Sequence, residues 1–322
     1  MALLITFILM AALQSVVFSK VIPTFYSEAA PTCDDYFYQN TEPEFTMQSS
    51  YQRICQMKSS IEPEKIFYAT LYDTNHKIPV YSAYTLVIGA SYERPSWMVE
   101  PQLENKSYGD DMVFSYSVND EYTFKTQASD EDYKGSGLTR GHCNPHSYHD
   151  GEERIATFTL TNIAPQYSEF NSGSWATAEQ EAKKIMAEHC FGNANQKLPY
   201  VKKFEDATAY FVTGAVPADK PSAVIGRNVT IPKISFTAAC CSDPEREEEF
   251  SFGYYGFNVV DASAQHTRAV KLTELQDILN KAWGGDQNIS FFEGGCNTQP
   301  EATQDHIGRM NKKLTKYLNK HG

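Results

Sequence analysis

The sequence has little positive charge for its length. Its 322 residues include 28 Lys and Arg against 40 Asp and Glu, which gives a formal net charge of −12. This balance argues against a basic protein that coats nucleic acid. It does not exclude an enzyme that acts on phosphates, because a few arginines and a divalent cation can reverse the field at one site.

The sequence also lacks internal repeats, a low-complexity linker and any second long apolar run. The one such run, LLITFILMAALQSVVFS within residues 1–19, predicts a secretory signal peptide, with the mature chain starting near Lys20. We therefore expect a secreted, extracellular protein that has no membrane span after signal cleavage. Three N-glycosylation sequons fit the same route, at Asn105, Asn228 and Asn288.

Seven cysteines all lie beyond the signal segment, which in an oxidising compartment predicts up to three disulfides and one unpaired thiol. We expect Cys143 to be the unpaired residue and Cys33–Cys55 to be a local bridge. The neighbours Cys240 and Cys241 are too close to bond to each other without strain. Each is expected to reach elsewhere, with Cys190 and Cys296 as the candidate partners.

The hydrophobic pattern predicts a mixture of helices and strands without regular βαβ alternation, which indicates an α+β fold. Residues 64–89 read as a β-hairpin that turns at Asp73, and Lys20 to about Lys58 reads as loop. A short strand is expected over Ile155–Leu160, and a helix over residues 175–189 with Ser174 as its N-cap. Further expected strands are 208–216, 221–226, 234–239 and 251–260, and further helices are 273–283 and 310–319.

The most informative stretch is GLTRGHCNPHSYHD, residues 137–150. Arg140 and His142 in this stretch are followed by Asn162, Asn171 and Glu179. A histidine can deprotonate water near neutral pH, and an asparagine oxygen is a hard ligand that suits Mg²⁺. A carboxylate can hold the waters of the ion, and arginine grips phosphate with a fork of donors. This set of side chains is suited to metal-assisted hydrolysis of a phosphodiester.

The segments TRGHCNP, TNIAPQ and FNSGSWATAE resemble the DNA/RNA non-specific endonuclease family, which carries the ββα-metal (His-Me finger) motif. The likeness extends over about residues 60–260, and SYERPSW resembles the upstream arginine segment of that family. The resemblance implies one α+β domain with a central antiparallel sheet, a ββα-metal motif and disulfide-bonded extensions. It also implies Mg²⁺ as cofactor, with Mn²⁺ as a substitute, and DNA or RNA as substrate.

The resemblance further implies a role for each matched residue. His142 would be the general base, and Asn171 would be the one direct protein ligand of the metal. Asn162 and Glu179 would orient the water and the metal shell. Arg94 and Arg140 would hold the phosphate. One position departs from the family, because Thr139 stands where the family has aspartate, and we expect this change to leave Arg140 less firmly held.

The implied boundaries are a signal peptide at 1–19, a Cys-containing extension at 20–59, the nuclease domain at 60–262 and a helical extension at 263–322.

Two alternatives stay open. Cys143, His146 and His149 have side chains and spacing that could ligate structural zinc. The protein could also be a secreted pseudo-nuclease, a binding or immune-related protein that kept the fold without catalysis, which the acidic balance and Thr139 favour.

Overall fold

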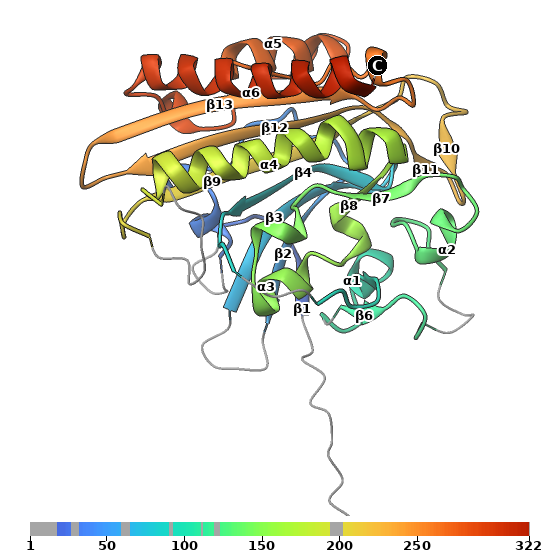
Figure 1. The fold of residues 1–322 in the computed structure, drawn as a ribbon. Helices are drawn as coiled ribbons and strands as arrows, with labels where there is room; N and C mark the ends of the chain where they lie inside the picture. Colours follow the sequence, from blue (N-terminus) through green and yellow to red (C-terminus); the bar gives the residue numbers. More distant parts are fainter. Residues whose placement is uncertain are drawn as a thin grey trace, which may run out of the picture.

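An eight-stranded antiparallel sheet forms the centre of the computed structural model, which describes residues 18–26, 32–58, 65–89, 93–110, 112–118, 123–193 and 202–321. Its strand order is β1-β2-β3-β4-β9-β12-β13-β14 (Figure 1). The strands are β1 Phe18–Ile22, β2 Tyr51–Lys58, β3 Lys65–Asp73, β4 Ile78–Thr85, β9 Thr208–Pro217, β12 Pro232–Asp243, β13 Glu248–Phe257 and β14 Arg268–Val270. The expected α+β fold with a central antiparallel sheet is confirmed.

The β3–β4 hairpin is where the sequence placed it. The Asp73 side chain accepts a hydrogen bond from the backbone N–H of Asn75 at 2.9 Å, which closes the turn. The expectation that Lys20 to Lys58 is loop is wrong for β1 and β2. In β2, Gln56 is fully buried because its amide donates to Glu100 at 2.6 Å, and a buried polar residue hides the alternation that marks a strand.

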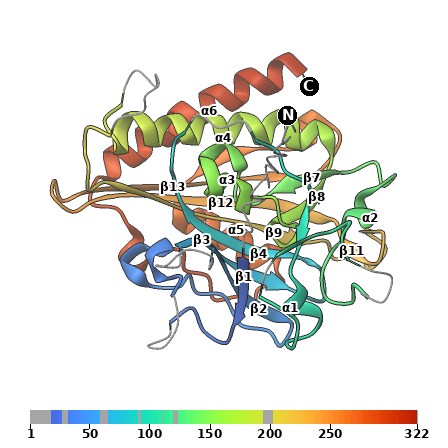
Figure 2. The ribbon, with the colours of Figure 1, turned by 90° about the horizontal axis from the view of Figure 1, so that it is seen from below.

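Helices cover both faces of the large sheet. Helices α4 (Ala176–Ile185) and α6 (Pro300–His321) pack on one face, and α5 (Leu272–Ala282) packs on the other, as the view in Figure 2 shows. Each helix buries an apolar stripe at helical spacing. The stripes are Ala178, Ala182 and Ile185 of α4, Ile307, Met310 and Leu314 of α6, and Leu275 and Leu279 of α5.

Smaller elements lie beside the start of α4. Strands β7 (Thr139–His142) and β8 (Ile163–Gln166) form an antiparallel pair that leads into α4, so that the order is strand, strand, helix. The other pairs are β5 (Met98–Val99) with β6 (Val113–Phe114) and β10 (Val224–Ile225) with β11 (Val229–Thr230). Two one-turn helices, α1 (Pro101–Glu104) and α2 (Asp130–Tyr133), lie between β5 and β7 in sequence.

Two local expectations near this motif are wrong. A helix, α3 (Gly151–Ala156), replaces the first part of the expected strand Ile155–Leu160, because Asp150 caps its first turn by accepting from the Gly151 N–H. Ser174 is not an N-cap. It lies inside a π-helical turn, Phe170–Trp175, and its hydroxyl hydrogen-bonds with Gln265 and Thr267.

The cysteine pairing agrees with the sequence analysis. The bridges are Cys33–Cys55, Cys190–Cys241 and Cys240–Cys296, and Cys143 is a buried free thiol. Cys240 and Cys241 are neighbours on β12, so their side chains point to opposite faces of that strand. One bridge therefore ties β12 to the segment after α4, and the other ties it to the segment before α6.

The segments expected to be extensions contribute to the same sheet. Strands β1 and β2 come from residues 20–59 and the two residues before them, and β14, α5 and α6 come from residues 263–322. The proposed signal segment lies almost entirely outside the described residues. Within the described ranges, no helix is both long and apolar enough to cross a membrane. The three sequon asparagines, Asn105, Asn228 and Asn288, are all exposed.

Candidate nuclease active site

A cavity of about 660 Å³ opens between β7, the start of α4 and the segment that precedes β5. Five of the six predicted functional residues line it, although they come from four separate parts of the chain: Arg94, Arg140, His142, Asn171 and Glu179. Its walls also include Trp97, His146 and Phe158. The fold therefore brings a histidine, a carboxylate, an amide and two guanidinium groups into one concave space.

The alternation of strand β7 explains why arginine and histidine are separated by glycine. Side chains two apart on a strand point to the same side, so Arg140 and His142 both reach the cavity. Gly141 faces inward, against β8. A Cβ atom added there would lie 2.1 Å from Gln166 Oε1, so a larger residue at this position would displace the buried Gln166 side chain.

His142 sits in an aromatic pocket. Its ring centroid lies 5.4 Å from that of Trp97, 5.2 Å from Phe158 and 5.0 Å from His146. Burial lowers the pKa of His142 well below its ordinary value, and His146 and nearby arginines add to the effect. Its Nε2 atom is buried and has no hydrogen-bond partner among the described residues. The imidazole is therefore neutral at physiological pH and can accept a proton.

Arg140 is held firmly, contrary to expectation. Its Nη2 donates to the carboxylate of Asp130 at 2.6 Å and to the carbonyl of the same residue at 3.0 Å. The guanidinium also lies 5.0 Å from the ring centre of Tyr133 and 5.7 Å from that of Trp97. A carboxylate from helix α2 thus fixes this arginine, and the absence of aspartate at position 139 does not loosen it.

Asn171 lies in the π-helical turn before α4, and Thr139 sets the orientation of its amide. The Thr139 hydroxyl donates to the carbonyl of Gln166 at 2.9 Å, and its oxygen accepts from Asn171 Nδ2 at 2.9 Å. Because the hydroxyl proton is used by Gln166, only the amide nitrogen of Asn171 can pair with Thr139. The amide oxygen is left on the other side as the atom that can bind a hard cation.

Glu179 lies on the first turns of α4, where it faces the cavity across from β7. Burial raises the pKa of its carboxyl to about 8. The turn is anchored from the other side, because the Tyr148 hydroxyl donates to the carbonyl of Glu179 at 2.6 Å. The position of Glu179 is therefore fixed through the backbone, and its side chain remains available to the cavity.

Asn162 does not line the cavity, so the structure does not bring it together with the other five predicted residues. It is fully buried, and its amide oxygen accepts from the Asn144 N–H at 2.8 Å and the Ser82 hydroxyl at 2.9 Å. Its amide nitrogen donates to the carbonyls of Asn144 and Thr157, both at 3.0 Å. With every donor and acceptor engaged, Asn162 acts by holding the segment that follows His142.

The sequence analysis considered His146, which lines the cavity, only as a zinc ligand, and it did not identify Arg154, which lies behind the cavity wall. His146 stacks on Phe158 with ring centroids 5.4 Å apart, and burial lowers its pKa to about 4. Arg154 of α3 donates to the carbonyls of Glu93 at 3.0 Å and His146 at 2.8 Å, which ties two walls of the cavity together. The close spacing of His142 and His146 was a usable signal, but no sequence signal marked Arg154.

The zinc alternative is not supported by the geometry. His149 is buried, its Nε2 pairs with Asn144 Oδ1, and its other nitrogen faces Glu153 at 3.7 Å. Cys143 is buried, and burial raises the pKa of its thiol. Among the described residues, no three His, Cys, Asp or Glu side chains come together as a metal-binding group.

Comparison with known proteins gives one consistent result. Residues 52–294 match the family described as DNA/RNA non-specific endonuclease. The chain is 30% identical over 286 residues to "Endonuclease domain-containing 1 protein" of Homo sapiens, covering 84% of this chain and 49% of that protein. It is 30% identical over 109 residues to "Nuclease EXOG, mitochondrial" of Xenopus laevis, covering 33% of this chain and 30% of that protein.

Among solved structures, one of an EndoG/EndoGI complex is similar with a TM-score of 0.44 and 16% identity, covering 81% of this chain and 90% of that chain. The chain spans about half the length of the curated relatives that it matches over most of its own length. The family match, in contrast, contains the whole cavity described above.

Proposed function

Because this chain belongs to the DNA/RNA non-specific endonuclease family, we propose that it is a secreted, divalent-metal-dependent nuclease that hydrolyses phosphodiester bonds of DNA or RNA without sequence preference. The observation that carries the proposal is the cavity that gathers Arg94, Arg140, His142, Asn171 and Glu179. Arg94 and Arg140 both line this cavity, so the substrate would be held through its phosphates.

His142 is the general base of the proposed reaction. It removes a proton from the attacking water as the bond between the water oxygen and phosphorus forms and the bond between phosphorus and the leaving ester oxygen breaks. The low pKa of His142 keeps it in the basic form, and the surrounding rings of Trp97 and Phe158 exclude bulk water from one side. Arg94 and Arg140 bind the non-bridging oxygens, and Asp130 keeps Arg140 in place as charge builds up on the phosphate.

The family is generally dependent on a divalent metal ion, and the donor set of the cavity fits one. Asn171 Oδ1 would hold the ion, and Glu179 would hold its waters. When bound, the ion supplies positive charge that neutralises the phosphate and stabilises the leaving oxygen. Mg²⁺ suits a site with so few protein ligands, because it keeps most of its waters and binds substrate phosphate.

Secretion is part of the proposal. Three disulfides favour an oxidising compartment, and three exposed sequons are compatible with passage through the secretory route. The apolar run in residues 1–19 would direct the chain to that route.

The test is degradation of plasmid DNA and of a structureless RNA, with Mg²⁺ or Mn²⁺ and with EDTA. We expect cleavage with either ion and none with EDTA. Asn171→Ala should raise the metal concentration needed for half-maximal rate, whereas Asn319→Ala, on the exposed side of α6, should not. A wild-type protein that is inert on both polymers with both ions would overturn the proposal in favour of a pseudo-nuclease.

A further inference from the structure

The last helix is basic although the chain as a whole is acidic. After Asp305 the sequence contains no Asp or Glu, but it contains Arg309 and four lysines: Lys312, Lys313, Lys316 and Lys320. All four lysines are exposed, and they pair with no carboxylate among the residues that the structure describes. A cluster of unpaired cations at one end of an acidic protein needs an explanation beyond solubility.

Three of these lysines share one flank of α6. At 100° per residue, Lys313, Lys316 and Lys320 fall on the same side of the helix as Arg309 and Tyr317. The apolar stripe of α6, centred on Met310 and Leu314, lies on the neighbouring side and packs on the sheet. The lysine flank, formed by Lys313, Lys316 and Lys320, therefore lies at the edge of the packed face, next to the element that neighbours α6.

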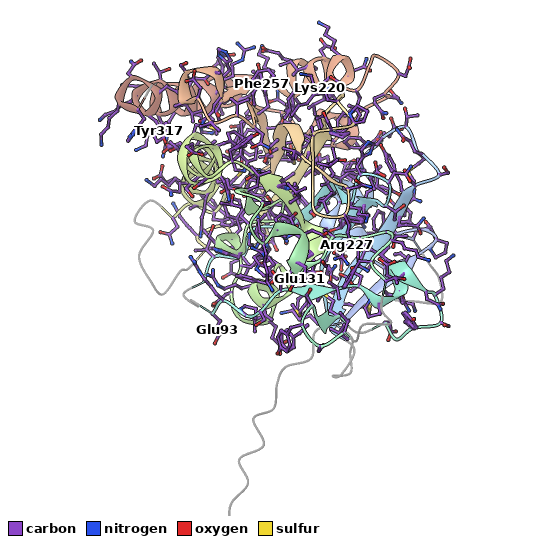
Figure 3. The ribbon with its side chains drawn as sticks, turned by 90° about the vertical axis from the view of Figure 1, so that its right-hand side faces the viewer. Glu93, Glu131, Lys220, Arg227, Phe257 and Tyr317 are labelled. Atoms are coloured by element: carbon purple, nitrogen blue, oxygen red, sulfur yellow. A yellow bond between two sulfur atoms is a disulfide. The ribbon has the colours of Figure 1, made fainter. Side chains whose placement is uncertain are left out.

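That neighbouring element is α4, which carries part of the cavity. Arg309 Nε donates to Glu181 of α4 at 2.6 Å. Two turns further along α6, Tyr317 packs on Gly173, where an added Cβ atom would lie 2.6 Å from the Tyr317 hydroxyl. Figure 3 shows Tyr317 directly above α4. The two helices run antiparallel, so the lysine flank passes the turn Phe170–Trp175 that holds Asn171.

Among the described residues, the strip of α4 that lies between the cavity and Glu181 carries no carboxylate. Ala176 and Glu179 face the cavity, and Glu181 faces α6. The strip between them consists of Gln180, which is exposed, and of Thr177 and Lys184, which are half-buried. A helix is about 10 Å across, which is the length that roughly three nucleotides of a strand span. A polynucleotide that leaves the cavity can therefore cross this strip to the lysines, and the two carboxylates on its α6 side, Glu181 and Glu188, are both paired with Arg309.

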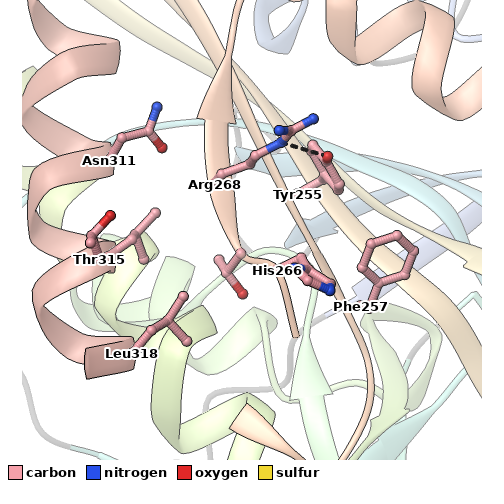
Figure 4. Close-up of a pocket in the computed structure, with 9 residues that line it drawn as sticks. Tyr255, Phe257, His266, Arg268, Asn311, Thr315 and Leu318 are labelled. Carbon is pink, nitrogen blue, oxygen red and sulfur yellow. Dashed lines mark hydrogen bonds between the residues drawn. The ribbon is translucent and has the colours of Figure 1, made fainter. Parts of the chain in front are cut away.

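The opposite side of α6 is fixed to the sheet, which makes the lysine flank a rigid surface. Asn311 accepts a hydrogen bond from the Ala269 N–H at 2.8 Å and donates to the Ala269 carbonyl at 2.9 Å, as a neighbouring strand would. Asn311, Thr315 and Leu318 line a separate cavity of about 460 Å³ against β13 and β14 (Figure 4). None of the three lysines of the flank lines that cavity.

We propose that Lys313, Lys316 and Lys320 form a phosphate-binding row, which contacts the backbone of the polynucleotide outside the cleaved linkage. The inference rests on the proposed function, since it assigns the flanking part of the same substrate to this surface. Lysine contacts to phosphate carry no sequence information, so the row adds affinity and chain-length dependence but no sequence preference.

The experiment measures binding without cleavage. The triple variant K313Q/K316Q/K320Q and a matched control, K220Q/K271Q/K281Q, are each made in a His142→Ala background. Lys220, Lys271 and Lys281 are exposed lysines elsewhere, so the control has the same change in net charge. Binding to a 40-nucleotide single strand and to a duplex is followed by fluorescence anisotropy at several salt concentrations.

We expect the row variant to bind with a Kd higher by about 10-fold at ~0.1 M salt and with a salt slope smaller by about 2–3 units, one per lost phosphate contact. The Kd and the salt slope of the control variant should change much less. In the His142→Ala background, the loss of affinity caused by the row variant should be small for an oligonucleotide that fills only the cavity. It should grow as the oligonucleotide is lengthened.

Equal effects of the two triple variants would overturn the proposal. So would a row variant that keeps its affinity for nucleic acid but loses binding to vesicles containing phosphatidylserine, because the row would then be a membrane-binding surface. The two proposals can fail separately. If the wild-type protein cleaves nothing but the row variant still loses nucleic-acid binding, the nuclease proposal is wrong and this one stands.

Discussion

The side-chain amide of Asn171 donates a hydrogen bond to the hydroxyl of Thr139 at 2.9 Å, across the gap between strand β7 and the turn before α4. Thr139 and Arg140 are neighbours on a strand, so their side chains point in opposite directions. The residue before Arg140 therefore acts on Asn171 and not on the arginine. Threonine can fill this position because one hydroxyl provides both the acceptor for Asn171 and the donor for Gln166.

The first prediction concerns this threonine. Thr139→Val keeps the shape of the side chain and removes the hydroxyl, so the Asn171 amide loses its partner. We expect the metal requirement to rise and the rate at limiting metal to fall about 2- to 10-fold, the scale of one hydrogen bond of ~0.5–1.5 kcal/mol. Thr139→Ser should retain most of the rate, and Thr139→Asp, which keeps an acceptor, should change it only modestly. A Val variant that needs no more metal than the wild type would contradict this role.

The second prediction concerns His142. Replacement by alanine should lower kcat/KM by about 10²-fold or more, the usual contribution of a positioned base, while the thermal unfolding midpoint stays close to that of the wild type. Because burial holds the pKa of His142 below its ordinary value, the basic form persists as the pH falls through 6.5. The pH–rate profile should therefore show no acid limb with a midpoint near 6.5. A limb near pH 8 would report Glu179, whose pKa burial raises to about 8, whereas a midpoint near 6.5 would contradict the buried, neutral state of His142.

The third prediction concerns stability in acid. His306 of α6 is 6% exposed, against Phe250 and His189, and burial lowers its pKa to about 4 from 6.5. Between those pH values the unfolded chain binds the proton and the folded chain does not, so this residue makes stability fall as the pH falls. The effect is on the order of 1–3 kcal/mol.

Other buried groups titrate in the same range, so the useful quantity is a difference between proteins. Denaturant unfolding of the wild type and of His306→Leu should be compared from pH 7 to pH 4. The variant should lose less stability over that range than the wild type does. His321→Leu, at the exposed end of the same helix, should follow the wild-type curve. Parallel curves for the wild type and His306→Leu would contradict the assignment.

Much of the fold could be predicted because local chemistry and tertiary structure agree. The β3–β4 hairpin has its Asp73 turn, and the bridge Cys33–Cys55 was expected. The sequence named Cys190 and Cys296 as the partners of Cys240 and Cys241, but it left open which residue pairs with which. The errors arose where tertiary contacts decide. Gln56 is buried in β2 by Glu100, and the expected strand after His149 is partly a helix because of its Asp150 cap.

The candidate site shows the same division. The residue types of the cavity are visible in the sequence because each is tied to a short motif. The residues that hold these side chains in place are not visible in the sequence. Asp130, Tyr133 and Arg154 come from short helices whose position depends on the whole fold. Asn162 belongs to a motif but is buried away from the cavity, and a motif alone cannot separate a residue that touches substrate from one that holds the backbone.

The last prediction concerns the pair that holds Arg140. The Asp130 carboxylate could restrain the guanidinium for phosphate, or it could compete with phosphate for it. Only Nη2 of the guanidinium is bound to Asp130, and Tyr133 and Trp97 lie close to it. The pair therefore fixes the group while leaving donors for the substrate. Asp130→Ala should lower kcat/KM about 10-fold, since a hydrogen bond to a charged group contributes ~1.5–3 kcal/mol and Asp130 is partly exposed.

Asp130→Asn keeps an acceptor and should give an intermediate value. The matched control is Glu131→Ala, which removes a carboxylate from the same turn of α2 but one whose partner is Lys134. Steady-state kinetics on a polynucleotide separate the two roles of Asp130. If Asp130 restrains Arg140, the Asp130→Ala substitution lowers kcat, because Arg140 is then less well placed for the charge that develops on phosphorus. If Asp130 competes with phosphate for Arg140, the same substitution lowers KM. An Asp130→Ala enzyme that is faster than the wild type would establish competition.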